Sequence, residues 1–407
     1  MILHLMQKDV PPILDTTQAI ALEKSSVESE MPVTTTAEPE RITKVKKLNK
    51  AQVKTKKPKR GLASSVLHPR TTSMPPRGAT PFSLLGYREP IKGGPNVYET
   101  TEIIPQHGSD EVDVHYQLRN DAILSSVASD AEDFTLIVVV TNDEKSWGLN
   151  RSAHDFFELL DTFTHPKEMT SVTLLTSSMS EFDKLQKLIQ GRIQDYTQLS
   201  LLYRTDFSVS KVTRENRHDV SLQRVRRRML TRYRNYALLT TLESWHQHVV
   251  WLDSDVIVVP PDLVSKMIEA DRDILTPLCK ICGKNNRVRE YDLNAWAGSR
   301  TTPESSSDRE DLFPGPLNVT HIRDFQNGAD DFIPLDSVGG TMLYVRADVH
   351  RQGVLFPHHF VIGSEWTQEG YDGIETEGLC YSAHFLGYRC WGMPHEVIYH
   401  APKDYQW

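Results

Sequence analysis

Apolar and polar positions alternate in blocks along the middle of the chain. The strongly apolar block over residues 134–141 predicts a buried strand, because short apolar runs of this length fit the inside of a sheet. The blocks after it predict a helix over residues 153–163, a strand over 171–176, a helix over 181–196 and a strand over 199–203. Strands that alternate with helices are typical of an α/β fold, in which a mainly parallel central sheet is flanked by helices.

The next block predicts an amphipathic helix over residues 221–245 with a basic face. Its apolar positions recur every three or four residues, which is the period of one helix face: Leu222, Val225, Met229, Tyr233, Tyr236 and Ala237. Six arginines occupy other positions before Asn235: Arg224, Arg226, Arg227, Arg228, Arg232 and Arg234. Guanidinium groups bind phosphate through a rigid fork of donors. The helix is therefore a candidate phosphate site, and a solvated basic face is the alternative.

Two aspartates stand two residues apart between apolar runs, in the segment over residues 251–261. In extended backbone, side chains at positions i and i+2 point to the same face. A sharp turn at Ser254 would let Asp253 and Asp255 converge on one cation. Mg²⁺ and Mn²⁺ prefer oxygen ligands and often share them with substrate phosphates. The pair indicates a metal site for a nucleotide diphosphate donor, although a solvated turn between two buried strands has the same pattern.

Two segments of the second half are candidates for binding sugars. The run over residues 291–296 combines Asp292 with aromatic rings, a mixture of polar contacts and stacking surfaces that suits sugars. A helix-capping Asp292 and a core Trp296 are the alternative. Further on, Gly339 and Gly340 allow a close approach of the backbone to a ligand, or form only a bulge or turn.

The composition fits one large domain with an appended tail. The chain has 407 residues, 39% of them hydrophobic, which is enough for a sizeable core. Residues 1–94 are rich in Thr, Ser, Pro, Glu and Lys and show little apolar periodicity, so we expect a disordered tail before a folded domain over residues 95–407. No stretch reaches the roughly 18 to 20 apolar residues that a membrane span needs.

Charge is distributed unevenly along the chain. The formal net charge is -8, whereas residues 41–60 contain ten Lys or Arg and no acidic residue. Such a tract can contact nucleic acid, act as a nuclear address or meet an anionic membrane surface. We expect a disordered segment here and no nucleic-acid partner.

The four cysteines do not form a zinc-binding pattern. Cys279 and Cys282 have a zinc-like spacing, but Cys380 and Cys390 are not a second pair of that kind. A structural zinc site is therefore not expected. A disulfide among the four is possible in an oxidising compartment, and its connectivity stays open.

The chain resembles the fungal Golgi mannosyltransferases of the mannan polymerase complexes, from about residue 95 to residue 400. The resemblance rests on seven blocks in the same order, which are Pro95-Asn96-Val97-Tyr98-Glu99-Thr100-Thr101-Glu102, Arg232-Tyr233-Arg234-Asn235-Tyr236, Trp251-Leu252-Asp253-Ser254-Asp255, Pro260-Pro261-Asp262-Leu263, Tyr291-Asp292-Leu293-Asn294-Ala295-Trp296, Asp336-Ser337-Val338-Gly339-Gly340 and Glu375-Thr376-Glu377-Gly378. It implies a GT-A nucleotide-diphospho-sugar transferase fold for the domain over residues 95–407. It also implies GDP-mannose as donor, Mn²⁺ or another divalent cation as cofactor, and retention of the anomeric configuration.

The resemblance and the residue patterns together define an expected site. A late histidine in GT-A enzymes often joins the Asp pair, so the expected metal ligands are Asp253, Asp255 and His400, with His395 as a competitor for the last place. The expected donor-binding residues are Arg227, Arg234, Asn235, Asp253, Ser254, Asp255, Asp292, Gly339 and Gly340. Catalytic roles fall on Asp253, Asp255, Glu375 and Glu377. The two glutamates are expected to support the reaction rather than act as nucleophiles, and glutamate early in a helix is also favourable for dipole reasons alone.

The resulting hypothesis is a metal-dependent mannosyltransferase that moves mannose from GDP-mannose to a mannose-bearing N-glycan or mannan acceptor, with an α-1,6 linkage favoured over α-1,2. The resemblance further implies a Golgi membrane protein with a lumenal catalytic domain that works with related subunits in a hetero-oligomer. Two alternatives stay open at this point. One is a non-catalytic scaffold subunit of such a complex, and the other is a protein that uses residues 41–60 on nucleic acid.

Overall fold

The computed structural model describes residues 89–90, 96–106, 110–127, 133–148, 150–217, 219–282, 287–300 and 317–402. Almost all of the expected tail over residues 1–94, including the basic tract over residues 41–60, lies outside these ranges, so the boundary at residue 95 stays a prediction. Within the described ranges, no helix combines the length and the apolar character that crossing a membrane would require.

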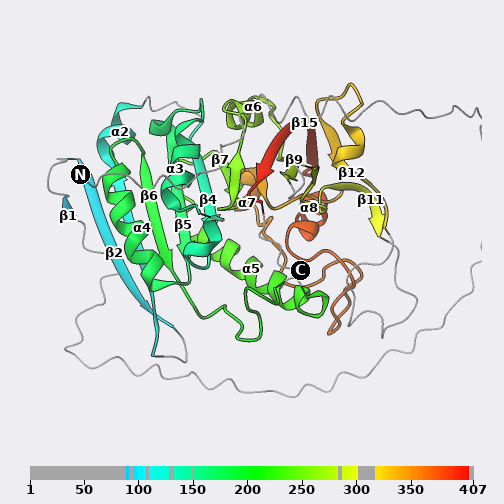
Figure 1. Cartoon of the computed structure of the whole chain (residues 1–407), viewed down its shortest axis with the longest axis horizontal. Coiled ribbons are helices and arrows are strands. Elements are labelled where there is room, and N and C mark those ends of the chain that lie inside the picture. Colours follow the sequence, from blue (N-terminus) through cyan, green and yellow to red (C-terminus); the bar gives the residue numbers. More distant parts are fainter. Residues whose placement is uncertain are drawn as a thin grey trace, which may run out of the picture. The chain divides into compact units, whose positions relative to one another are not determined.

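Four parallel strands form the centre of the main sheet, in the order β6-β5-β4-β7. They are β4 (Thr135–Val140), β5 (Thr170–Thr176), β6 (Gln198–Tyr203) and β7 (His248–Leu252), and they alternate along the chain with α3 (Ala153–Asp161), α4 (Met179–Arg192) and α5 (Val220–Thr241). Figure 1 shows this half of the molecule with its strands side by side and its helices around them. The predicted α/β class with helices flanking a central sheet is confirmed. The prediction of a mainly parallel sheet is wrong: the parallel part is limited to this centre and to the pair of β9 (Ile274–Cys282) and β15 (Cys390–His400), and the other described strand pairs are antiparallel.

Alternate residues of β4 enter two different cores, as expected for a strand whose side chains point to opposite faces. Ile137 and Val139 pack in the cluster that contains the apolar side chains of α3 and α4. Leu136 and Val138 pack in the cluster that contains Ala237 and other apolar residues of α5. The sheet is therefore covered on both faces, with α5 opposite the other two helices.

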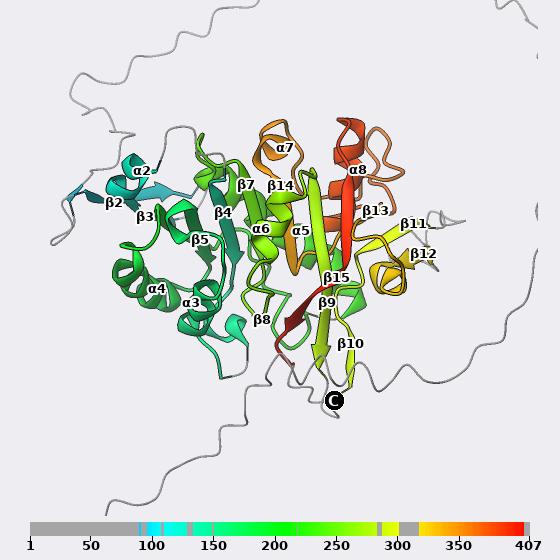
Figure 2. The ribbon, with the colours of Figure 1, turned by 90° about the horizontal axis from the view of Figure 1, so that it is seen from above.

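Antiparallel strands extend the sheet on both sides of this centre (Figure 2). On one side lie β3 (Val112–Asn120), β2 (Val97–Pro105) and β1 (Glu89–Pro90), with the short helix α2 (Asp121–Ser126) after β3. On the other side, β14 (Met342–Arg346) pairs with both β7 and β9 (Ile274–Cys282), and β15 (Cys390–His400) runs parallel to β9. The remaining elements are β8 (Val256–Val258), α6 (Leu263–Glu269), β10 (Val288–Glu290), β11 (Trp296–Arg300), β12 (Leu317–His321), β13 (Ile333–Leu335), α7 (Ala347–Arg351) and α8 (Thr376–Phe385).

The basic helix α5 ends at Thr241, four residues before the predicted end. The buried side chain of His246 accounts for this difference: its Nδ1 accepts a hydrogen bond from the Glu243 backbone N–H at 3.0 Å, and its Nε2 lies 2.9 Å from Ser171 Oγ. A side chain that binds a backbone N–H competes with the helical hydrogen bond. The chain therefore turns toward β7 instead of continuing the helix.

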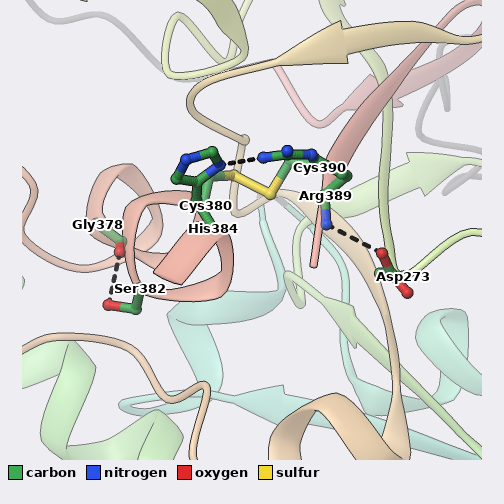
Figure 3. The surroundings of a disulfide bond; sticks show 7 residues. All are labelled: Asp273, Gly378, Cys380, Ser382, His384, Arg389 and Cys390. Carbon is green, nitrogen blue, oxygen red and sulfur yellow. Dashed lines mark hydrogen bonds between the residues drawn. A yellow bond between two sulfur atoms is a disulfide. The ribbon is translucent and has the colours of Figure 1, made fainter. Parts of the chain in front are cut away.

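A disulfide joins Cys380 of α8 to Cys390 at the start of β15 (Figure 3). Hydrogen bonds lie on both sides of it, from the Arg389 backbone N–H to Asp273 Oδ2 at 3.0 Å and from Ser382 Oγ to the Gly378 carbonyl at 3.0 Å. The disulfide answers the question of connectivity that the sequence left open. Disulfides persist in oxidising compartments such as the secretory pathway.

Removing this disulfide is expected to lower the free energy of unfolding by about 2–3 kcal/mol, because the crosslink closes a loop of ten residues in the unfolded chain. The change is Cys380→Ser with Cys390→Ser, measured by denaturant unfolding without reductant. Cys282→Ser, at a half-buried cysteine that forms no disulfide, controls for loss of a thiol. A reductant should lower the stability of the wild type and leave the double variant unchanged; equal sensitivity of both proteins would contradict the prediction.

Candidate active site

A cleft of about 1840 Å³ opens at the carboxyl ends of the parallel strands. Asn142 after β4, Ser177 after β5 and Asp253 after β7 all lie in its wall, which is where α/β sheets bind ligands. Most of the predicted site residues also line it: Arg227, Arg234, Asp253, Ser254, Asp255, Asp292, Gly340, Glu375 and His400. The fold thus gathers residues from both halves of the chain around one cavity.

The Asp-Ser-Asp segment forms the predicted tight turn between β7 and β8. The Val256 N–H donates to the Asp253 carbonyl at 3.2 Å, which closes the turn. The Asp253 N–H donates to the Thr341 carbonyl at 2.9 Å, and Ser254 Oγ donates to the Ser146 carbonyl at 2.7 Å. These bonds fix the backbone that presents both carboxylates. They also occupy the Ser254 hydroxyl proton, so a contact between Ser254 and the donor stays a prediction.

Asp255 and His400 form a close pair at the base of the cleft. His400 Nε2 lies 2.9 Å from Asp255 Oδ2, and its Nδ1 donates to the Ala401 carbonyl at 2.7 Å. The ring of Tyr291 lies against the imidazole, with centroids 3.8 Å apart. Nδ1 carries the proton that the carbonyl accepts, so Nε2 directs either its lone pair or a second proton at the carboxylate. His395, the competitor for this role, is exposed on β15 and does not line the cleft.

This pair fits a divalent cation of the Mg²⁺ or Mn²⁺ type. Ligating histidines usually donate their second ring N–H to a carbonyl or carboxylate, as His400 does here. Adjacent ligands of an octahedral ion at about 2.1 Å lie roughly 3 Å apart, which matches the distance between Nε2 and Oδ2. A nitrogen and a carboxylate oxygen are also suitable donors for manganese.

Asp253 lies on the other side of the turn and contacts an arginine instead. Its Oδ1 is 3.3 Å from Arg234 Nη2. Burial raises the pKa of Asp253 to about 7; the Arg234 charge opposes this rise and the Asp255 carboxylate adds to it. Among the side chains that the structure describes, no three His, Cys, Asp or Glu residues already converge as a metal-ligand set. The structure thus brings together two of the three predicted ligands, Asp255 and His400. Asp253 lies on the same turn, and a bound cation would stabilise the charged form of its carboxylate.

The arginines expected to bind the donor contact buried carboxylates. Arg227 Nη1 lies 2.8 Å from Glu377 Oε2, and Arg234 Nη1 lies 2.9 Å from Glu375 Oε1. All four side chains are at least nine-tenths buried. Glu375 has a backbone φ of 61°, a left-handed conformation that costs energy for a residue other than glycine. Each glutamate thus holds an arginine at the cleft wall, which is an arrangement compatible with the supporting role predicted for them. Glu377 itself does not line the cleft.

Asp292 connects the glycine segment to the aspartate turn. Its Oδ2 accepts hydrogen bonds from the backbone N–H of Gly340 at 2.7 Å and of Thr341 at 3.1 Å, and from Thr341 Oγ1 at 2.9 Å. Thr341 in turn accepts from the Asp253 N–H. A Cβ at Gly339 would lie 2.4 Å from Asp292 Oδ2, and one at Gly340 would lie 2.8 Å from Arg234 Nη1. The glycines thus allow a close approach of protein side chains, and the predicted close approach of a ligand stays a prediction.

The variant Gly339→Ala should therefore lose activity and stability together. The added methyl group must displace Asp292, which frees Thr341 and the turn that presents Asp253; overpacking of this kind costs about 1–3 kcal/mol. Gly191→Ala is a matched control, because nothing lies within 4 Å of a Cβ at that helical position and alanine favours a helix. Thermal melting and nucleotide binding measure the two effects. A Gly339→Ala protein that behaves like Gly191→Ala would contradict the expectation.

Asn235 differs from its prediction. Its amide Nδ2 donates to the Phe356 carbonyl at 2.8 Å, and its Oδ1 accepts from the Phe356 N–H at 3.1 Å. Asn235 does not line the cleft. Both polar ends of the side chain hold the loop after α7 against α5, so this geometry does not support its predicted contact with a donor.

Several residues of the cleft were not singled out from the sequence. Arg214 and Arg217 come from the loop before α5, and Thr341 comes from the segment before β14. The only signal available for the two arginines was the general basic character of the region. The position of Thr341 depends on a tertiary contact with Asp292, which no local pattern encodes. The ring of Tyr291, which the sequence offered as a stacking surface for a sugar, lies against His400.

Comparisons with known proteins agree on a fungal family. The family model described as Anp1 matches residues 114–360, which is more than half of the chain. The mannan polymerase complex subunit mnn9 of Schizosaccharomyces pombe is 28% identical over 255 residues, covering 58% of this chain and 73% of the relative. The mannan polymerase I complex VAN1 subunit of Saccharomyces cerevisiae is 30% identical over 206 residues, covering 46% of this chain and 36% of the relative. The chain thus spans only part of the length of these relatives.

The chain is also similar to solved structures. One is the mannosyltransferase PcManGT from Pyrobaculum calidifontis in complex with GDP-Man and Mn²⁺, at 13% identity and a TM-score of 0.39, covering 70% of this chain and 63% of that one. Another is GalNAc-T7 with UDP, GalNAc and Mn²⁺, at 15% identity and a TM-score of 0.41, covering 67% and 43%. At these TM-scores the likeness carries no argument about ligands or reaction. The family match over residues 114–360, together with relatives named as mannan polymerase subunits, shows that the chain belongs to the Anp1 family.

Proposed function

We propose that this chain is a metal-dependent retaining mannosyltransferase that uses GDP-mannose as donor. The observation that carries the proposal is the pair of Asp255 and His400, whose ring is oriented by a backbone carbonyl in the manner of a metal ligand. The pair lies in a cleft lined by arginines, as a diphosphate site requires. The names of the relatives, which are subunits of mannan polymerase complexes, favour mannose as the transferred sugar.

Asp255 and His400 would hold a divalent cation, and Asp253 would be the third protein ligand. The cation would supply positive charge to a diphosphate leaving group. Arg234 would add a fixed positive charge at the cleft wall, because its ion pair with Glu375 holds the guanidinium in place. Charge that is preorganised in this way needs no rearrangement as the reaction proceeds.

In the proposed transfer, the bond between mannose C1 and the phosphate oxygen breaks, and its electron pair stays on the phosphate. A hydroxyl oxygen of the acceptor forms the new bond to C1 on the same face of the sugar, and the hydroxyl proton passes to the leaving phosphate. This balance requires no protein nucleophile. It agrees with the positions of Glu375 and Glu377, whose carboxylates are paired with arginines.

The acceptor is proposed to be a mannose-bearing N-glycan or mannan, extended through an α-1,6 linkage. The proposed setting is the Golgi lumen, in a hetero-oligomer with related subunits, because the relatives are named as subunits of such complexes. The disulfide between Cys380 and Cys390 supports an oxidising compartment. A scaffold subunit without catalysis is the second candidate, favoured by the same subunit names.

Binding of GDP-mannose to the purified chain, with and without Mn²⁺, separates the two candidates. An enzyme should bind the donor with an affinity that rises with Mn²⁺, and should then transfer mannose to a mannose oligomer, whose linkage can be analysed. A scaffold should show neither. UDP-glucose is the matched control donor, and equal binding of both nucleotide sugars would remove the assignment of GDP-mannose.

A further inference from the structure

The segment between α7 and α8 forms a small hairpin that carries a tryptophan at its tip. Glu365 and Gln368 exchange two backbone hydrogen bonds of 3.0 Å, which close a turn with Trp366 and Thr367 at its centre. Trp366 is 95% exposed, whereas tryptophan is highly buried on average. Thr367 has a backbone φ of 69°, which is costly for a β-branched residue, and strain of this kind clusters at sites that hold ligands. The indole ring is therefore available to a ligand.

The base of this hairpin is fixed to α5. Glu369 accepts hydrogen bonds from Arg228 Nη2 at 2.7 Å and from the Phe360 N–H at 2.9 Å, and Arg224 Nη2 lies 3.0 Å from its carboxylate. Arg228 Nε also donates to the His358 carbonyl at 3.0 Å. These contacts hold the arm that presents the indole. An aromatic ring on a fixed arm loses little conformational freedom when it binds.

The hairpin lies beside the cleft. Arg227, which lines the cleft, directly precedes Arg228, which holds the hairpin. On its other side the chain runs from the hairpin to Glu375, which also lines the cleft. Trp366 is three residues from Glu369, so their Cα atoms are at most about 11 Å apart. Figure 1 shows this segment, just before α8, beside the first turns of α5. The indole is thus within reach of an elongated ligand that extends from the cleft on the side of α5.

The surroundings of Trp366 favour a sugar over a protein or a membrane surface. Its neighbours at the tip are polar: Ser364, Glu365, Thr367 and Gln368. Within the described segment over residues 357–375, no other large apolar side chain is exposed. A protein interface needs a contiguous apolar centre, and an anionic membrane surface attracts basic residues. A single aromatic face with polar groups at its edge matches a sugar ring, which has apolar C–H faces and a rim of hydroxyls.

We propose that Trp366 is a stacking platform for the acceptor glycan, several sugar units away from the reacting end. This inference rests on the proposed function and adds the residue that favours long acceptors over short ones. One face of the indole covers the C–H face of a sugar, and the side chains of Glu365 and Gln368 offer hydrogen bonds to its hydroxyls. A glycan that is long enough to occupy both the cleft and the hairpin gains affinity from two linked contacts.

The test compares acceptors of different length in Trp366→Ala and in Phe385→Ala, a change at another exposed aromatic ring, on α8. Trp366→Ala should raise the KM for α-1,6-linked mannohexaose about tenfold, or about 1.4 kcal/mol, with kcat unchanged, because the platform binds substrate and transition state alike. Its kcat/KM for mannobiose should equal that of the wild type. Trp366→Phe should keep most of the affinity, since a ring remains. Phe385→Ala should behave like the wild type with both acceptors.

Calorimetric titration with mannohexaose, in the absence of donor, reports the platform independently of transfer. The affinity should fall about tenfold in Trp366→Ala and by a smaller factor in Glu369→Gln, whose arm is held less firmly. Melting temperatures show whether each variant is folded.

Equal mannohexaose affinity of Trp366→Ala and the wild type would overturn the inference, and so would a wild type that does not bind mannohexaose. A Trp366→Ala protein that keeps its glycan affinity but dissociates from an oligomer to a monomer in light scattering would assign the ring to a protein partner instead. If mannohexaose binding depends on Trp366 but no mannose is transferred from GDP-mannose, the platform stands and the proposed catalytic function falls.

Discussion

Replacing Asp255 with Ala should abolish mannose transfer and donor hydrolysis, with a loss of about 10³-fold or more. The change removes the carboxylate that faces His400 Nε2 at 2.9 Å and with it one ligand of the proposed cation. Removing a single preorganised electrostatic contact already costs about 10²–10³-fold in other enzymes. The measurements are transfer from GDP-mannose to a mannose oligomer and the rise in melting temperature that Mn²⁺ with GDP-mannose produces by binding the folded state.

The wild type should show that rise, and Asp255→Ala should not. Asp183→Ala, at an exposed carboxylate on α4, is the matched control and should retain both activity and the rise. Without metal, the Asp255→Ala protein should melt close to the wild type, because the side chain is at the cleft surface with 26% of it exposed. A folded and active Asp255→Ala protein would remove the metal assignment.

Arg234→Met should inactivate the protein and also destabilise it by about 3 kcal/mol or more. The change leaves Glu375 buried without its cationic partner, and breaking one side of a buried ion pair typically costs about 3–5 kcal/mol. It also removes the arginine contacts to Asp253 and to the Gly340 carbonyl, both at 3.3 Å. Denaturant unfolding measures the stability and the transfer assay measures the activity.

A second substitution separates the two effects of Arg234. In Arg234→Met with Glu375→Met, no charge is left buried without a partner, so much of the stability should return. Activity should not return, because the fixed positive charge at the cleft wall is still missing. Arg224→Met is the control for loss of an arginine from α5, since its partly exposed pair with Glu369 is worth about 1 kcal/mol. Recovery of activity in the double variant would show that Arg234 acts only through stability.

Local patterns in the sequence predicted the parallel half of the fold well. The apolar run before Asn142, the two helices after it and the turn at Ser254 all depend on neighbours in the chain, so periodicity and turn chemistry were sufficient. The outer strands were harder to predict. β14 fits between β7 and β9 by antiparallel pairing with both, and nothing in its own five residues specifies those partners.

The sequence predicted which residues line the candidate site better than it predicted which of them contact one another. His400 and Asp255 meet because β15 pairs with β8, next to the aspartate turn, and the resemblance supplied that relation where local reasoning left His395 as a competitor. Roles among the arginines could not be assigned from the sequence. Arg226 and Arg227 are neighbours with the same chemistry, and only the position of Glu377 distinguishes the one that is already paired.

The crosslink between α8 and β15 has a practical bearing on how this protein should be produced. α8 begins next to Glu375 and β15 ends at His400, so the covalent bond between Cys380 and Cys390 joins two elements that each lead to a residue lining the cleft. Material made in a reducing bacterial cytoplasm would lack this link and hold these two elements together less firmly. Secretion from yeast, or export to a bacterial periplasm, is the appropriate route to protein for the assays above.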